Sequence, residues 1–521
     1  MGVTGVTIFG TSGDDNLTGT SGDDYFDLRQ GGHDTASGLG GDDTFFMGGN
    51  LDPDDRLDGG TGTDSVILSG NYSRFGGLHI NSTIFTSIED VVLKGPHHMV
   101  ITLDAGAAPA GETLTVDARQ LAVTDSTVAL TLDATAATDG NYIVKLGSGT
   151  PQYQVDFGAQ LKATDHIDGG AGYTYLYLDG DYDMRFTAKT IHNIANFSMD
   201  ATHSYRFVEN DANLDAGFTM QVGCVADVGQ TDNFNGSAET DGAFSFVMGA
   251  GTMLLKGGAG DDVFGGAVTA ADRISGGAGN DTLYYDGGDA GGDNFHKVAQ
   301  GIETVVLSHA GGNYSLYTKG HVADAGKDLT VDASDMTGAQ NLTLNDANDT
   351  GGIHLVNGAN DLIATGSMQA DSFDLTGGGT CTVYAAGGAD TIMADSSAHE
   401  HFVYKAAGDS TSTGYDTISG VNFATDEFNV HAAGGAVVGV DSAVTGGALS
   451  TATFDSDLAA AIGAGQMTAH TAVLFTADSG TLSGHTFLVV DENGTAGYQA
   501  GADLVIDVTG ATGTLALGDF G

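Results

Sequence analysis

The sequence predicts an all-β protein whose chain is wound as a parallel β-roll or β-solenoid. The first observation is a nine-residue repeat, rich in glycine and aspartate, that recurs along the chain. The second is a longer repeat of about 107 residues, present three times. The third is the alternation of apolar and polar side chains between the glycine-rich stretches, which is the period of a half-buried strand.

The composition fits a repeat array better than a fibrous or disordered chain. The 521 residues include 83 glycines but only 4 prolines, and 41% of them are hydrophobic, which excludes collagen and argues against disorder. Acidic residues number 68 against 16 basic ones, a formal net charge of −52. Such a charge destabilises a compact state unless cations enter the structure. It also argues against nucleic acid and anionic membranes as partners, because both require basic patches.

The cysteines and the N-terminus indicate which classes of secreted or membrane protein the chain does not fit. Cys224 and Cys381 lie far apart in the sequence without metal-ligand spacing, so we expect lone buried thiols. The first ten residues lack the cationic start and apolar run of a cleaved secretory signal. No stretch reaches the roughly 18 to 20 apolar residues of a membrane-spanning helix, so we expect no membrane insertion. Export therefore requires another signal.

The nine-residue unit follows the pattern G-G-x-G-x-D-x-U-x, in which U is a large apolar residue. Clear copies occupy residues 10–17, 19–26, 59–66, 257–264 and 276–283. The paired glycines accept backbone angles closed to other residues and predict turns. The apolar residue two places after the aspartate begins a very short strand.

The repeat supplies the ligands that calcium prefers. Ca²⁺ takes six to eight hard oxygen ligands, which the aspartate carboxylate and the carbonyls of the glycine turn provide. Two units make one coil of about 18 residues, so aspartates two units apart are expected on the same side, as for Asp15 with Asp34 and Asp24 with Asp43. An ordinary turn rich in aspartate and glycine is the alternative for any single copy. The tandem copies favour calcium.

This pattern resembles the repeats-in-toxin (RTX) family, proteins exported by type I secretion whose repeats form a parallel β-roll with calcium between successive turns. The resemblance covers residues 10–67, 257–284 and 366–393. Carried over by position, it implies these calcium ligands: Asp15, Asp24, Asp34, Asp43, Asp64, Asp262, Asp272, Asp281, Asp371 and Asp390. The sequence departs from the pattern at Thr174, which replaces an aspartate and predicts an empty site. The loop at residues 52–55 breaks the nine-residue register.

The longer repeat predicts three related β-modules. The tetrad at residues 55–58 recurs at 165–168 and 272–275, and the segment 88–93 matches 302–307. A row of β-sandwich-like modules is the alternative to a solenoid for this part of the chain.

Within the modules, short alternating segments are expected to be strands. They are residues 114–116, 128–132, 342–344 and 353–356. Helical periodicity is almost absent, and residues 457–462 are the best candidate for a helix.

These patterns divide the chain into seven parts. They are an RTX array at 1–67, β-modules at 68–165 and 166–256, a second array at 257–284, a third β-module at 285–365, a degenerate array with its cap at 366–430, and a C-terminal β region with a type I secretion signal at 431–521.

The C-terminal part carries two further resemblances. Residues 402–428 resemble the segment that follows RTX arrays in serralysin-type secreted proteins. The strand, turn and strand at 486–506 are similar to the export region of surface-layer and related RTX proteins, which would explain the missing N-terminal signal. Asp491, Asn493 and Asp503 in this turn offer a further ion site, with a plain hairpin as the alternative.

We find no enzyme motif. His399-Glu400-His401 has Val403 where the second zinc ligand of H-E-x-x-H is required, and neither a G-x-S-x-G elbow nor a phosphate-binding loop occurs. We therefore interpret the chain as a non-catalytic, secreted, calcium-binding structural protein of the cell surface, similar to S-layer proteins. Its expected partners are calcium ions, copies of itself in a lattice, cell-surface polysaccharide and a type I exporter. The alternative is an RTX surface adhesin or a carbohydrate-binding or carbohydrate-cleaving protein.

Overall fold

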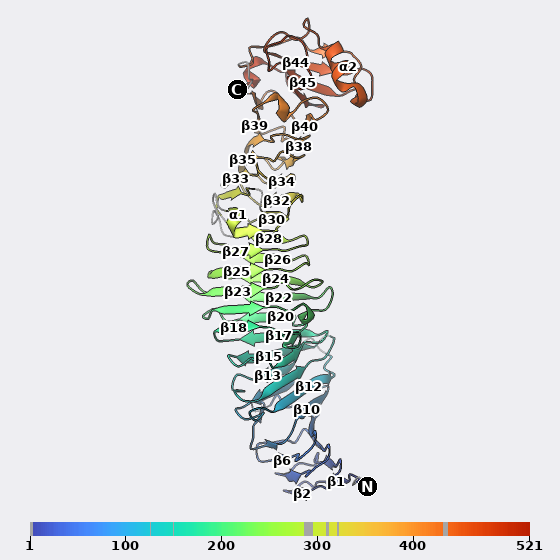
Figure 1. The fold of residues 1–521 in the computed structure, drawn as a ribbon, viewed down its shortest axis with the longest axis vertical. Coiled ribbons are helices and arrows are strands. Elements are labelled where there is room, and N and C mark those ends of the chain that lie inside the picture. Colours follow the sequence, from blue (N-terminus) through green and yellow to red (C-terminus); the bar gives the residue numbers. More distant parts are fainter. Residues whose placement is uncertain are drawn as a thin grey trace. The chain divides into compact units, whose positions relative to one another are not determined.

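The computed structural model describes residues 4–74, 76–124, 127–149, 151–285, 295–308, 312–319, 322–430 and 436–521. The chain divides into two compact units, Met1–Asp262 and Val263–Gly521. Within each unit, short strands are stacked coil upon coil, and helices are few (Figure 1). The prediction of an all-β parallel solenoid is confirmed.

The first unit contains four sets of parallel strands. One set runs β1 (Thr7–Phe9), β3 (Tyr25–Asp27), β5 (Thr44–Gly48), β7 (Ser65–Leu68), β10 (Asp90–Gly95), β12 (Thr113–Leu121), β14 (Asn141–Lys145), β16 (His166–Asp168) and β19 (Ile191–His192). A second runs β2 (Asn16–Thr18), β4 (Thr35–Ser37), β6 (Arg56–Asp58) and β9 (Phe85–Thr86). A third runs β8 (Leu78–Ile80), β11 (Met99–Leu103), β13 (Val128–Asp133), β15 (Gln152–Gly158), β17 (Tyr173–Leu178), β20 (Asn196–Met199), β22 (Thr219–Cys224) and β24 (Ala243–Met248). The fourth runs β18 (Tyr182–Arg185), β21 (Tyr205–Val208), β23 (Thr231–Asn235) and β25 (Thr252–Lys256), and a short 3-10 helix spans Asp211–Asn213.

The apolar position of the nine-residue unit forms the core of this solenoid. Phe26 pairs with Phe45 and Phe45 with Val66, and all three are fully buried. The rings of Phe26 and Phe45 stack with their centroids 4.7 Å apart. The column continues through buried apolar residues of the first two predicted β-modules, which are Val91, Val116, Val144, Ile167 and Ile191. Array and module are therefore coils of one solenoid.

The second unit repeats this construction. One set of strands runs β26 (Val263–Gly266), β28 (Thr282–Tyr285), β30 (Thr304–Leu307), β32 (Leu329–Ala333), β34 (Ile353–Asn357), β36 (Ser372–Asp374), β38 (Thr391–Met393) and β40 (Asp416–Ser419). Another runs β31 (Tyr314–Tyr317), β33 (Asn341–Asn345), β35 (Asp361–Thr365), β37 (Thr380–Tyr384), β39 (His399–Tyr404) and β41 (Glu427–Val430). β27 (Arg273–Ser275) pairs with β29 (Ala299–Gln300) beside the one-turn helix α1 (Phe295–Val298). Leu283, Val305 and Val331 are successive buried members of its core column.

The C-terminal part of the second unit changes to antiparallel pairing. β44 (Thr471–Thr476) pairs antiparallel with β45 (Thr486–Val490), and β45 with β46 (Leu504–Asp507). Helix α2 (Phe454–Ala461) packs Leu458 into the apolar core behind these strands. The short strands β42 (Gly439–Val440) and β43 (Val444–Thr445) pair parallel with β44. Short 3-10 helices span Ala407–Asp409, Thr451–Thr453 and Leu517–Asp519. β46 also pairs parallel with β40, which joins this block to the last coil.

The expectations for local structure agree with these elements. The four alternating segments lie in strands β12, β13, β33 and β34. The predicted helix at 457–462 overlaps α2 and extends one residue beyond its C-terminal end. Cys224 and Cys381 are both free and buried, as expected. The strands of the predicted modules pair in parallel, which excludes the β-sandwich alternative for the strands described. The seven-part division stays a prediction. In the described residues we find no helix with the length and apolarity needed to cross a membrane.

The glycine turns pack so closely that a side chain is excluded. At Gly41 the backbone has φ of +102°, and a Cβ atom would overlap the carbonyl carbon of Gly22 on the preceding coil. Gly111 has a similar φ of +90°, but a Cβ atom there would meet nothing within 4 Å. We predict that Gly111→Ala costs about 1–2 kcal/mol for its left-handed backbone alone. Gly41→Ala should cost clearly more, because coil stacking must also open. Denaturant unfolding of both variants in calcium measures the difference, and equal losses would contradict close coil stacking.

Candidate functional site

The sixth-position aspartates of the first array form a hydrogen-bonded ladder on the inside of the turns. The backbone N–H of Asp24 donates to Asp43 Oδ1, and the N–H of Asp43 donates to Asp64 Oδ1, each at 2.7 Å. On the other side of the coil, the N–H of Asp15 donates to Asp34 Oδ1 at 3.0 Å. Each carboxylate is thus fixed by the coil before it. The structure brings together the aspartates that the repeat spacing pairs.

In three of these carboxylates the second oxygen is buried and has no partner among the described residues. Among the described residues, the Oδ2 atoms of Asp34, Asp43 and Asp64 accept no hydrogen bond, and all three side chains are fully buried. Burial, with the charges of Asp43 and Glu89 nearby, raises the pKa of Asp64 to about 6. Buried charges without partners are costly. The arrangement calls for a cation between successive coils.

The glycines complete an all-oxygen cradle. A Cβ atom at Gly38 would overlap Asp43 Oδ2 and lie 2.7 Å from the carbonyl oxygen of Gly59 on the next coil. A Cβ atom at Gly59 would likewise overlap Asp64 Oδ2 and the carbonyl oxygen of Ser87. Carboxylate and carbonyl oxygens therefore converge on a space that only glycine leaves open. Hard oxygen ligands of this kind fit calcium rather than a transition metal.

The loop at residues 52–55 does not interrupt the ladder. The N–H of Asp34 donates to Asp55 Oδ1 at 2.7 Å, and the N–H of Asp52 donates to Asp55 Oδ2 at 2.8 Å. The loop breaks the sequence register, but Asp55 returns to the ladder position and is fully buried. Asp165 and Asp272 have the same bond from the N–H three residues before them. In the sequence, the sign of this role for Asp55 is the tetrad at residues 55–58, which recurs at 165–168 and 272–275.

Glutamates take the aspartate position in the coil after the last repeat. The N–H of Asp64 donates to Glu89 Oε2 at 2.7 Å, and the N–H of Asp281 donates to Glu303 Oε2 at 2.9 Å. The nine-residue pattern does not include them. Their equivalent places in the matching segments 88–93 and 302–307 are the only sign of this role in the sequence.

The remaining predicted ligands occupy similar positions. Asp262 Oδ1 accepts the N–H of Phe244 at 2.6 Å, and burial raises the pKa of Asp262 to about 6. In the degenerate array, the N–H of Asp371 donates to Asp390 Oδ1 at 2.8 Å. The N–H of Asp390 donates to Asp416 Oδ1 at 3.0 Å, which adds Asp416 to this ladder. Thr174 takes the place of the aspartate in its coil and brings no charge. Its hydroxyl donates to the carbonyl of Gly169 at 3.1 Å.

The C-terminal turn is different, because its carboxylates are already engaged. Asp491 accepts the N–H groups of His470, Asn493 and Gly494. Asp503 accepts the Asn493 side-chain amide at 3.1 Å and the Gln499 N–H at 2.7 Å. These bonds favour the plain hairpin over the ion site.

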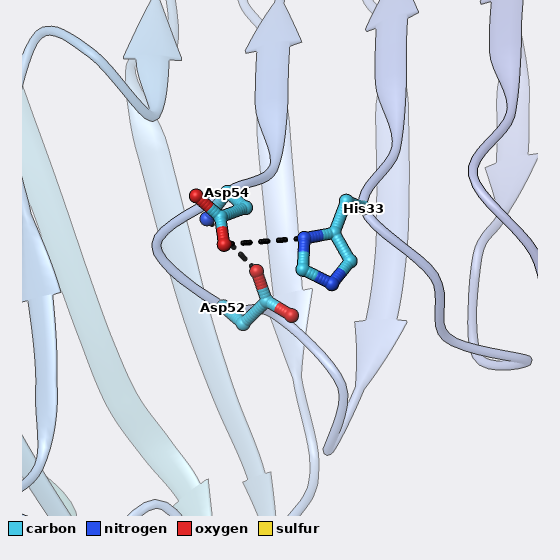
Figure 2. A group of neighbouring side chains, drawn as sticks. All are labelled: His33, Asp52 and Asp54. Carbon is cyan, nitrogen blue, oxygen red and sulfur yellow. Dashed lines mark hydrogen bonds and ion pairs between the residues drawn. The ribbon is translucent and has the colours of Figure 1, made fainter.

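A small acidic cluster with one histidine lies on the outside of the loop at residues 52–55. Figure 2 shows His33, Asp52 and Asp54 pointing toward one another, with His33 Nδ1 3.2 Å from Asp54 Oδ2. One ligand atom from each lies within 4.8 Å of the others. The side chains of His33 and Asp54 are more than half exposed, so water satisfies them. This distinguishes the cluster from the buried ladder.

Fold and site together define a parallel β-solenoid with cation-binding turns. Residues 7–31 and 269–290 match the family model of the RTX calcium-binding nonapeptide repeat (4 copies). The chain therefore carries RTX calcium-binding repeats, as the sequence pattern predicted. The matched residues lie in the first array and across the second. No curated protein matches the chain as a relative.

A matched pair of substitutions tests the ladder. We predict that Asp43→Asn weakens calcium binding by at least about tenfold, because it removes a buried ligand charge. Asp42→Asn removes the same charge from an exposed neighbour that accepts the N–H of Thr63 at 2.9 Å. It should change the affinity less than about twofold. Calcium titrations followed by circular dichroism measure both, and equal effects would contradict the assigned ligand.

Proposed function

We propose that the chain is a secreted, non-catalytic calcium protein that serves as a structural component of a cell surface. The observation that carries this proposal is the buried carboxylate ladder, which would couple folding to cation binding along successive coils. Calcium is scarce inside cells and plentiful outside, so a chain of charge −52 would remain unfolded before export and fold after it. Type I secretion, as in RTX proteins, suits such a chain.

Self-association into a lattice is the finer part of this proposal. The solenoid exposes apolar side chains at intervals, among them Ile363 and Met368, with exposures of 57% and 65%. Exposed carboxylates of neighbouring copies would share calcium ions. Electron microscopy tests the lattice. Purified protein should form ordered sheets in millimolar calcium and return to monomers in chelator. Monomers at every calcium concentration would contradict it.

One observation favours the adhesin or carbohydrate-binding alternative. Tyr173, Tyr175 and Tyr177 follow one another on the outer face of β17, with centroids 5.0 Å and 6.0 Å apart. Tyr173 and Tyr177 are 45% and 37% exposed, and exposed aromatic rings pack against the apolar faces of sugars. An adhesin would stay monomeric and bind a glycan array in calcium. Tyr173→Ala with Tyr177→Ala would abolish that binding without changing the calcium affinity.

A further inference from the structure

A buried acidic group outside the nine-residue pattern lies one coil before the degenerate array of the second unit. Asp346 and Asp349 follow strand β33, and their exposed fractions are 0% and 7%. The N–H of Asp346 donates to the carbonyl of Thr365 at 2.9 Å, which places it beside the turn that begins with Gly366. The N–H of Asp349 donates to the carbonyl of Asp346 at 2.9 Å, so both side chains belong to one tight turn.

The oxygen atoms of this turn are only partly satisfied. Thr318 is fully buried, and its hydroxyl donates to Asp346 Oδ1. Asp349 Oδ1 accepts the N–H of Thr350 at 2.8 Å. The Oδ2 atoms of Asp346 and Asp349 are buried and accept no hydrogen bond from the described residues. Two buried carboxylates on one tight turn require either a shared proton or a cation.

The position of Asp371 favours the cation. Asp371 Oδ1 accepts the N–H of Ile353 at 2.7 Å, so its carboxylate faces the coil that carries Asp346 and Asp349. In the ladder, each aspartate faces an aspartate of the preceding coil, but here that place is taken by Ile353. Asp346 and Asp349 supply the carboxylates that the pattern lacks.

The first unit contains a counterpart before Asp262. Glu209 and Glu239 are each 1% exposed, and both oxygens of Glu209 and the Oε2 of Glu239 have no hydrogen-bond partner among the described residues. The N–H of Glu209 donates to the carbonyl of Asn235 at 2.9 Å, which places Glu209 on the coil adjoining the Glu239 turn. Asp262 accepts the N–H of Phe244 as Asp371 accepts that of Ile353. Both units thus have a pair of buried, unpartnered acids before the first aspartate of an array, on one turn in the second unit and on adjoining coils in the first.

We propose that Asp346 with Asp349, and separately Glu209 with Glu239, each bind a calcium ion that begins the ladder of the array that follows. These start sites would lie at the beginning of a ladder, whereas Glu89 and Glu303 lie at the end of one. The inference rests on the proposed calcium-dependent function, since it assumes that calcium fills the ladder sites. Calcium is the expected cation, because all the ligands are hard oxygens.

The test counts calcium ions on the full-length chain. Equilibrium dialysis in saturating calcium, followed by atomic absorption, gives the number of ions bound to each chain. Asp346→Asn with Asp349→Asn should lower that number by one, and Glu209→Gln with Glu239→Gln should also lower it by one. Asp349→Asn alone should weaken one site by at least about tenfold. The matched single substitution at exposed Asp335, Asp335→Asn, should leave number and affinity unchanged.

The outcomes separate this inference from the proposed function. An unchanged number of ions in both double variants, with greater stability in chelator, would mean that the acids share a proton and would overturn the start sites alone. A wild-type chain that binds no calcium would overturn the proposed function as well. Circular dichroism in calcium checks that each variant folds. If the Asp346 double variant does not fold, the Asp349 single variant and the Glu209 double variant decide the question.

Discussion

Chelation of calcium at pH 7.5 is expected to unfold the solenoid coils of both units. Each site held at a hundred times its Kd adds about 2.7 kcal/mol to the free energy of unfolding. A typical domain has only about 5–15 kcal/mol in total, so the loss of a few sites exceeds it. Without calcium, the buried carboxylates of Asp34, Asp43 and Asp64 remain as unpaired charges in the core. Circular dichroism should show the strand signal in millimolar calcium and its loss in EGTA.

Magnesium provides the control for this experiment. EGTA with excess magnesium removes calcium at the same ionic strength, and Mg²⁺ demands a tighter octahedral geometry than these turns offer. The strand signal should therefore stay lost until calcium is returned. A chain that keeps its full signal and its thermal midpoint in EGTA would contradict calcium-dependent folding.

Acidification in chelator is expected to restore part of the lost stability. Burial raises the pKa values of Asp64, Asp262 and Asp371 in the metal-free fold to about 6, whereas the unfolded chain keeps a pKa near 3.9. A raised pKa means that the folded state binds protons more tightly. The stability from these groups is therefore present below about pH 4 and is lost as the pH rises through about 6. Each contributes on the order of 1–3 kcal/mol. Circular dichroism of the calcium-depleted chain should therefore show part of the lost strand signal returning at pH 5, while the signal stays absent at pH 7.5.

The opposite pH dependence is expected with calcium, because protons then compete with the ion for the same carboxylates.

High salt distinguishes the titration of the buried ladder carboxylates from repulsion between surface charges. At 0.5 M sodium chloride the exposed charges are screened, while the buried carboxylates still titrate, so the difference between pH 5 and pH 7.5 in chelator should persist. Its disappearance in salt would assign the effect to the surface charge instead.

Much of this architecture follows from local patterns in the sequence. The apolar position of the repeat predicts the buried column through Phe26, Phe45 and Val66, because a period of one coil places these residues above one another. The aspartate spacing likewise predicts the contact of Asp24 with Asp43. Both depend only on a constant repeat length.

Some features could not be predicted from the sequence. They depend on a change in the repeat length or on another residue in the place of the aspartate. Asp55 reaches the ladder after a longer loop, and Glu89 does so with a longer side chain, so neither fits the nine-residue pattern. Asp346 and Glu209 contact neighbouring coils through Thr318 and Asn235, which lie 28 and 26 residues away in the sequence. Short-range periodicity carries no information on such contacts.

The loop at residues 52–55 has a consequence for the use of this scaffold. The ladder carboxylates Asp15 and Asp34, before the loop, are 19 residues apart, and Asp34 and Asp55, across it, are 21 apart, yet β5 and β7 still pair in parallel, with one register shift. The extra residues lie in the loop between β5 and β6, where Pro53 and Asp54 are exposed to solvent. In this loop Asp52 and Asp54 point toward each other and toward His33 (Figure 2). A foreign peptide grafted between Asp52 and Asp54 would therefore be presented to solvent from an intact wall. The corners of the solenoid are natural display positions for epitopes or enzymes.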